Sequence, residues 1–142
     1  MSDSENPPKH EGGCMCGRTR FTIFAGSNFA SYCHCDDCRT STGGALSAFV
    51  GFPTASIVWQ GEPLAIYKSS KNVSRSFCPE CGSPVCYDDE KLPENSYFYV
   101  GMLDNPDDFP MQSHSYIGGR LSWVHINDDL PQFDGTAAPR EE

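Results

Sequence analysis

The sequence lacks long apolar runs and is poor in positive charge. No segment reaches the ~18 consecutive apolar residues of a membrane-spanning helix, so we expect no membrane partner. Acidic residues outnumber Lys and Arg by 19 to 10, which gives a formal net charge of −9 at pH 7. No run of Lys and Arg offsets this balance locally. Such a surface repels phosphate backbones, so we expect no nucleic-acid partner.

We do not expect the first eleven residues to act as a secretory signal. Residues 1–11 are mostly polar and contain Pro7 and Pro8 without an apolar segment. We interpret them as a disordered leader and expect a cytoplasmic protein. The chain length suits one compact domain, which we place at residues 12–135, followed by a flexible tail at residues 136–142.

Short apolar segments separated by Gly and Pro indicate an all-β domain. Phe21 and Ile23 alternate with polar neighbours, as on a half-buried strand. Similar segments recur at roughly ten-residue spacing. We find no internal repeat and no convincing long amphipathic helix. The predicted strands are residues 18–24, 46–50, 56–60, 64–68, 73–77, 85–87, 97–103 and 121–126, the last at a sheet edge. Residues 36–42 are predicted to form one short helical turn.

Eight cysteines are the most informative feature of the composition. In a chain without a secretory signal, structural disulfides are rare and clustered thiols more often bind metal or carry out chemistry. Thiols one or two residues apart also suit a shared metal better than an unstrained disulfide. We therefore favour metal, with disulfides as the alternative in an oxidising compartment.

Two cysteine pairs have the spacing of metal ligands. The segment C-P-E-C-G at residues 78–82 is arranged like a zinc knuckle, in which a tight turn aims both thiols at one ion and Gly82 permits a positive φ. The segment C-M-C at residues 14–16 places two thiols on the same side of an extended chain. Together the two pairs can close a structural site with four thiolates.

A third group of thiols lies in C-H-C-D-D-C-R at residues 33–39. A structural zinc site normally has four protein ligands, whereas a catalytic site has three and leaves a position for water or substrate. If the other pairs satisfy each other, Cys33, Cys35 and Cys38 form an open metal site. His34 lies between two ligands and points away from them in an extended segment, so we predict that it is not a ligand.

The remaining cysteine and histidines have simpler interpretations. Cys86 lies in an apolar run and is most simply a small buried residue. Alternative fourth ligands for the open site are His10, His114 and His125, although each is more simply a surface or core histidine.

Three motifs in this order resemble the glutathione-dependent formaldehyde-activating enzyme family, which includes centromere protein V. They are G-G-C-M-C-G-R-T-R at residues 12–20, C-H-C-D-D-C-R at 33–39 and F-C-P-E-C-G-S at 77–83. His114, Trp123 and L-P-Q-F-D at residues 130–134 resemble the family's C-terminal pattern. The resemblance implies a mainly β fold, a compact zinc-stapled antiparallel β-sheet domain of β-tent-like shape with few or no long helices, and two Zn²⁺ per chain.

The resemblance also implies roles for the cysteines and a reaction. By position, the structural zinc ligands are Cys14, Cys16, Cys78 and Cys81, and the catalytic zinc ligands are Cys33, Cys35 and Cys38. The family's namesake reaction adds glutathione reversibly to formaldehyde, giving S-hydroxymethylglutathione. We therefore expect a carbon–sulfur lyase or synthase acting on glutathione and an aldehyde, or on a glutathione adduct. Two alternatives stay open: a non-catalytic zinc-binding protein-interaction module, and a lyase acting on a thiol adduct of a larger metabolite.

Glutathione carries two carboxylates, which need positive or N–H-rich contacts. Arg39 is the nearest cation to the open site, and Thr40 and Ser41 follow it directly. We predict that these three residues contact substrate. Arg39 can instead pair with Asp36 or Asp37 on the surface.

Overall fold

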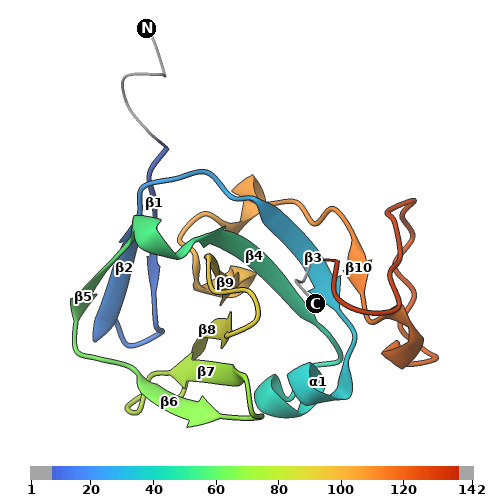
Figure 1. Ribbon diagram of the computed structural model, residues 1–142, viewed down its shortest axis with the longest axis horizontal. Coiled ribbons are helices and arrows are strands. Elements are labelled where there is room, and N and C mark those ends of the chain that lie inside the picture. Colours follow the sequence, from blue (N-terminus) through green and yellow to red (C-terminus); the bar gives the residue numbers. More distant parts are fainter. Residues whose placement is uncertain (1–7, 138–142) are drawn as a thin grey trace, which may run out of the picture.

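A computed structural model describes residues 8–137, in which ten strands form two sheets (Figure 1). The small sheet has the order β1-β2-β5, and the large sheet has the order β10-β3-β4-β9-β8-β7-β6. The strands are β1 (His10–Gly13), β2 (Thr19–Ile23), β3 (Phe29–Cys33), β4 (Ser47–Pro53), β5 (Ile57–Gly61), β6 (Ala65–Lys68), β7 (Val73–Phe77), β8 (Pro84–Asp89), β9 (Asn95–Tyr99) and β10 (His114–Ser115). The helical segments are α1 (Asp36–Thr42) and the 3₁₀ turns η2 (Thr54–Ser56), η3 (Val100–Met102), η4 (Pro106–Asp108) and η5 (Ile117–Gly119).

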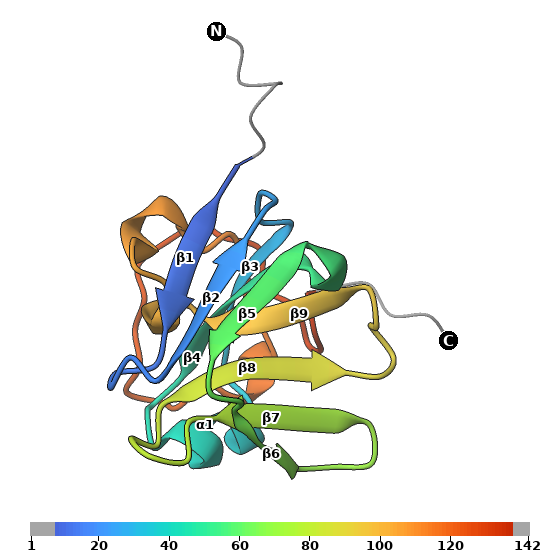
Figure 2. The ribbon, with the colours of Figure 1, turned by 90° about the vertical axis from the view of Figure 1, so that its left-hand side faces the viewer.

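The prediction of a mainly β domain with few helices is confirmed. The strand pairs are antiparallel except for β10 and β3, which run parallel. In Figure 2 the small sheet faces the viewer, and β9, β8, β7 and β6 follow one another below it. No helix within residues 8–137 is long and apolar enough to cross a membrane.

The central strands β4 and β9 separate the two hydrophobic clusters of the domain. Val50 pairs with Phe98, and both are fully buried in the larger cluster together with Phe21 of the small sheet. The adjacent pair, Phe49 and Tyr99, belongs to a smaller cluster that includes two of the cysteines. Because successive side chains of a strand face opposite sides of the sheet, the same two strands build the core and support the cysteine site.

Gly12 of β1 is the point at which the small sheet contacts the segment that follows β9. Gly12 forms a β-bridge with Leu103, and the N–H of Asp104 donates to the carbonyl of Glu11. A Cβ atom at Gly12 would lie 2.3 Å from the carbonyl oxygen of Met102. Only glycine permits this close approach of two backbones.

Predicted boundaries differ from the structure at the start of the chain and after β9. β1 begins at His10, inside the segment predicted as a leader, and residues 1–7 of that segment lie outside the described part of the chain. The strand predicted at 97–103 ends at Tyr99, where η3 follows. The tail prediction falls mostly on residues 138–142, which are also outside the described residues.

The edge strand predicted at residues 121–126 is wrong. The N–H of Val124 donates to the carbonyl of Leu121, and Arg120 Nη1 donates to the carbonyl of Val124, so this backbone forms a turn. Trp123 is 67% exposed. Of the apolar side chains in this segment only Val124 is buried, and β10 occupies the sheet edge instead.

Candidate functional site

Four thiols from two distant parts of the chain meet at one point. Cys14 and Cys16 lie between β1 and β2, and Cys78 and Cys81 lie between β7 and β8. The Sγ atom of Cys16 is 3.7 Å from that of Cys14 and 3.7 Å from that of Cys78, and all four sulfurs lie within 4.8 Å of one another. Zinc–sulfur bonds of ~2.3 Å at tetrahedral angles place sulfurs about 3.8 Å apart. The spacing therefore fits a four-thiolate metal site and far exceeds a disulfide bond.

Backbone N–H groups surround these sulfurs as they do in thiolate sites. The N–H of Thr19 donates to Cys14 Sγ at 3.4 Å, and the N–H of Cys81 donates to Cys78 Sγ at 3.5 Å. Contacts with Ser83 lower the pKa of the Cys81 thiol to about 5. Gly82 has the positive φ, 80°, that the knuckle motif predicts. The N–H groups and the Ser83 contacts favour the ionised thiols that metal binding requires.

The second thiol group lies where β3 runs into α1. Cys33 ends β3, Cys35 is the N-cap of α1, and Cys38 is in the first turn of the helix. Cys33 Sγ is 3.5 Å from Cys35 Sγ and 3.4 Å from Cys38 Sγ. Cys35 has extended backbone angles, and its sulfur accepts a hydrogen bond from the N–H of Cys38. Capping by Cys35 thus turns the chain so that the third thiol faces the first two.

The three crowded thiols cannot all ionise without a compensating charge. Hydrogen bonds with Cys33, and then with Cys38, lower the pKa of Cys35 to about 2. The contact with Cys35, and then that with Cys38, raises the pKa of Cys33 far above its usual value. A bound divalent cation would allow all three to become thiolates, so the donor set fits a metal ion.

A cavity of about 410 Å³ adjoins this second group. This volume is within the ~300–1,000 Å³ range of small-molecule sites. All three cysteines line the cavity, together with aromatic and charged side chains. The aromatic residues in the lining are Phe29, Phe49, Tyr87, Tyr97 and Tyr116, and the charged ones are Asp36, Asp37, Arg75, Asp89 and Lys91.

Arg75 on β7 is a cation in contact with the three-thiol group, and it was not predicted from the sequence. Its side chain is buried, and Nη1 lies 3.2 Å from Tyr99 Oη, 3.1 Å from Ser41 Oγ and 3.9 Å from Cys38 Sγ. The guanidinium carbon is 5.0 Å from the centroid of the Tyr87 ring. Burial lowers the pKa of Arg75, but the nearby Tyr99 and Cys38 groups raise it above its usual value. The cavity therefore has a permanent positive charge beside the sulfurs.

Arg39, the predicted substrate cation, makes different contacts. Its Nη1 atom donates to the carbonyl oxygens of His34 and Gly119, each at 2.7 Å. Neither Arg39, Thr40 nor Ser41 is among the residues that line the cavity. Ser41 reaches it indirectly, through Arg75. Contact of these three residues with substrate stays a prediction.

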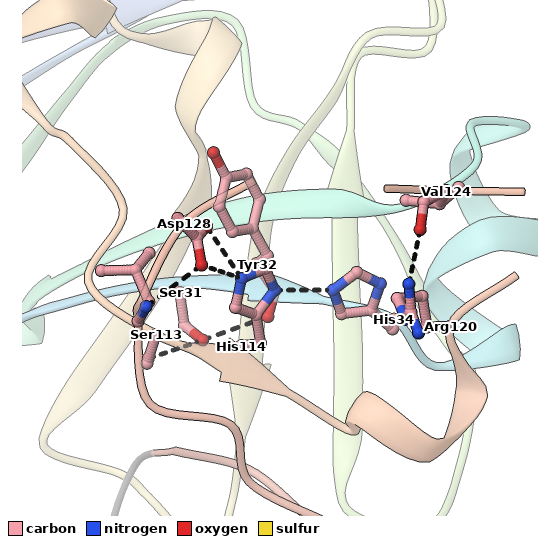
Figure 3. Close-up of polar contacts among 9 residues, drawn as sticks. Ser31, Tyr32, His34, Ser113, His114, Arg120, Val124 and Asp128 are labelled. Atoms are coloured by element: carbon pink, nitrogen blue, oxygen red, sulfur yellow. Dashed lines mark hydrogen bonds and ion pairs between the residues drawn. The ribbon is translucent and has the colours of Figure 1, made fainter. Parts of the chain in front are cut away.

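The histidines and Cys86 lie outside both thiol groups. His34 is fully buried, and its imidazole faces His114 (Figure 3). Burial lowers the pKa of His34, and the positive groups around it lower it further. Cys86 is 1% exposed, as predicted for a small buried residue. The prediction that His34 is not a ligand agrees with this arrangement.

Comparison with known proteins agrees with the cysteine pattern. The sequence profile of the glutathione-dependent formaldehyde-activating enzyme family matches residues 9–119. A Schizosaccharomyces pombe protein named as an uncharacterized lyase is 28% identical over 99 residues, which cover 67% of this chain and 72% of the yeast protein. A crystal structure of a Rhodobacter sphaeroides protein, a structural genomics target, has a TM-score of 0.55 at 19% identity and shows a similar fold; the match covers 86% of this chain and 98% of the other. The chain described here belongs to the glutathione-dependent formaldehyde-activating enzyme family.

Proposed function

We propose that this chain is a zinc-dependent carbon–sulfur lyase that makes or breaks the bond between the glutathione sulfur and an aldehyde carbon. The observation that carries the proposal is the position of Cys33, Cys35 and Cys38 together on the wall of a cavity of about 410 Å³. A purely structural zinc normally has four protein ligands and needs no cavity. Family membership and the yeast relative named as a lyase support the same glutathione-related, lyase-like role.

Zinc is the metal that suits both thiol groups. Thiolates at tetrahedral spacing favour zinc over the hard cations that prefer oxygen ligands. When held by three thiolates, zinc supplies a further coordination position and the Lewis acidity that favours a substrate thiolate over its thiol. The four-thiol group would hold a second, structural zinc that joins the β1–β2 loop to the β7–β8 turn.

The reaction requires stabilisation of a developing oxygen charge. In the direction of synthesis, the glutathione sulfur bonds to the carbonyl carbon, the π bond of the carbonyl breaks, and the thiol proton ends on the new hydroxyl oxygen. The reverse direction passes through the same charge distribution. Arg75 is permanently charged, fixed by Tyr99 and Ser41, and lines the same cavity as the thiols. We assign Arg75 the stabilisation of this oxygen.

Charges at the edge of the cavity complement the ends of glutathione. The tripeptide has two carboxylates and one ammonium group. Lys91 is exposed and lines the cavity, where it can pair with a carboxylate. Asp36 and Asp37 are also exposed in the lining and suit the ammonium group.

The aromatic lining favours a second candidate, a lyase acting on adducts of larger carbonyl compounds. Formaldehyde adds only one carbon and one oxygen to glutathione. Phe29, Phe49, Tyr87 and Tyr97 offer apolar surface beyond what that group would contact. Aldehydes with apolar substituents could use this surface.

Zinc counting and adduct analysis on the same protein test the proposal. Native mass spectrometry is expected to find two zincs per chain, and Cys35→Ser is expected to lose one while remaining folded. Wild-type protein should accelerate both formation and breakdown of glutathione adducts, followed by mass spectrometry for formaldehyde and a series of larger aldehydes. Cys35→Ser should accelerate neither reaction, whereas the control Cys86→Ser should accelerate both. A single zinc in the wild type, or full activity in Cys35→Ser, would contradict the proposal.

A further inference from the structure

A row of polar side chains runs from the buried His34 through the buried His114 to the half-buried Asp128 (Figure 3). His34 Nε2 is 2.9 Å from His114 Nδ1, and His114 Nε2 is 3.0 Å from Asp128 Oδ2. The His114 ring is nearly parallel to the phenol ring of Tyr32 and to the imidazole of His34, with ring centroids 5.0 and 5.1 Å away. His34 is fully buried and His114 is 3% exposed. None of these groups lines the cavity, so the proposed reaction does not use them directly.

The carboxylate at the end of the row determines the direction of its hydrogen bonds. Asp128 can only accept, so His114 Nε2 carries the hydrogen of that contact. With both imidazoles neutral, His114 Nδ1 then accepts from the Nε2–H of His34. This assignment leaves His34 Nδ1 as a lone pair, and that atom is buried without a hydrogen-bond partner. All of the hydrogen bonding of the His34 side chain is therefore directed at Asp128 through His114.

His34 lies between the first two thiols, and its hydrogen-bonded side chain holds this segment of the chain in place. The ladder between β3 and β4 ends at Cys33, and the last backbone bond to β10 runs from the N–H of His34 to the carbonyl of Ser115. Cys33 and Cys35 flank His34, and alternate side chains of an extended segment point to opposite sides. Fixing the imidazole on one side consequently fixes both sulfurs on the other.

The far end of the row is itself held by the backbone. The N–H of Leu130 donates to Asp128 Oδ1, and the N–H of His114 donates to the carbonyl of Pro131. The N–H of Phe133 donates to the carbonyl of His114. Against the effect of burial, the Leu130 N–H and His114 hold the pKa of Asp128 below its usual value. Asp128 is thus a fixed charged acceptor.

We propose that Asp128, His114 and His34 form a positioning row that holds the Cys33 and Cys35 thiols in place for metal binding. The inference rests on the proposed metal site at Cys33, Cys35 and Cys38. Partners outside the ligand shell typically contribute 10–100-fold to metal affinity. Breaking the row should therefore weaken this site selectively and leave the four-thiol site unchanged.

Asp128→Ala in the zinc-loaded protein tests the row. The protein is challenged with rising chelator concentrations, native mass spectrometry counts the zincs retained, and alkylation with peptide mapping identifies the cysteines released. Asp128→Ala is expected to lose zinc from the three-thiol site at chelator concentrations ~10-fold lower than the wild type does. Asp128→Asn, whose amide oxygen still accepts from His114 and Leu130, should recover part of the loss. Asp129→Ala, at the exposed neighbouring position, should match the wild type.

Three outcomes would overturn the inference. The first is unchanged zinc retention at the three-thiol site in Asp128→Ala. The second is that Asp128→Ala loses zinc equally from both sites and in proportion to a fall in Tm. This result would mean that the row only supports the fold. The third is a wild-type protein without zinc at these three cysteines, which would refute the metal site as well. Zinc at both sites without lyase activity would refute the proposed function alone.

Discussion

Replacing Arg75 by Met is the most direct test of how the cavity works. Met retains an unbranched, apolar side chain of similar reach but removes the charge and the hydrogen bonds to Ser41, Ser69 and Tyr99. The two serines are exposed and can bond to water, whereas Tyr99 is 7% exposed and loses a buried partner. Stability and activity should therefore change by different amounts.

The stability change is expected to be modest. Loss of the hydrogen bond from the charged guanidinium to the buried Tyr99 hydroxyl, which still contacts Ser41, costs about 1.5–3 kcal/mol. Removal of a guanidinium from a buried position offsets part of this cost, because the charge no longer has to be desolvated. We expect a net loss of about 1–2 kcal/mol, which lowers Tm by about 3–7 °C for an unfolding entropy of ~2.1 cal/mol/K per residue.

The loss of activity should be much larger than the stability change implies. Removing one donor that stabilises a developing oxyanion costs about 10²–10³-fold in kcat. Arg75→Lys keeps the charge but not the planar fork, so its kcat should fall between those of Met and the wild type. Lys91→Met removes an exposed cation of the same cavity and is expected to raise KM for glutathione with little change in kcat. Wild-type kcat in a folded Arg75→Met protein would refute the role assigned to Arg75.

Three further changes test the metal sites and the packing. Cys78→Ser should lose the structural zinc and cooperative unfolding, measured by metal analysis and thermal scans, whereas the buried Cys86→Ser should keep two zincs. Gly12→Ala should lower the free energy of unfolding by about 2–4 kcal/mol because its Cβ would collide with the Met102 carbonyl; Gly101→Ala, with open space around it, should stay within about 0.5 kcal/mol. Chelation that removes only the zinc of the three-thiol site should abolish adduct formation, and added Zn²⁺ should restore it while Tm stays near that of the untreated protein.

Local chemistry explains which features could be predicted from the sequence. The helical turn at residues 36–42 coincides with α1, and the predicted strand at 73–77 coincides with β7. Both depend on nearby residues: a capping residue starts the helix, and turn residues bound the strand. The grouping of the seven thiols could also be predicted, because a ligand pair one or two residues apart already determines where its sulfurs point.

The contacts of Arg75 could not be predicted, because they depend on strand register. In V-S-R-S-F, an arginine between two serines resembles the solvent-facing part of a strand. Pairing of β7 with β8 places Arg75 opposite Tyr87, and the packing of α1 brings Ser41 to it. Only this arrangement turns a polar strand residue into a buried cation.

The partners of His34 are equally remote in the sequence. His114 is 80 residues away, and Asp128 lies a further 14 residues along. Spacing near the cysteines indicated only that His34 points away from the metal ligands. What it points toward depends on the parallel pairing of β10 with β3, which no local pattern predicts.

The two thiol groups differ in how a bound metal would relate to the stability of the fold. The four-thiol group joins segments about sixty residues apart, so a metal there acts as a cross-link and its loss should cost stability. The three-thiol group lies within residues 33–38, so a metal there closes almost no loop and stabilises the fold little. Its geometry must be imposed by the protein, through the end of β3, the capping of α1 and the row from His34 to Asp128. Because the fold shapes this site, three protein ligands suffice and the fourth side of the metal can face the cavity.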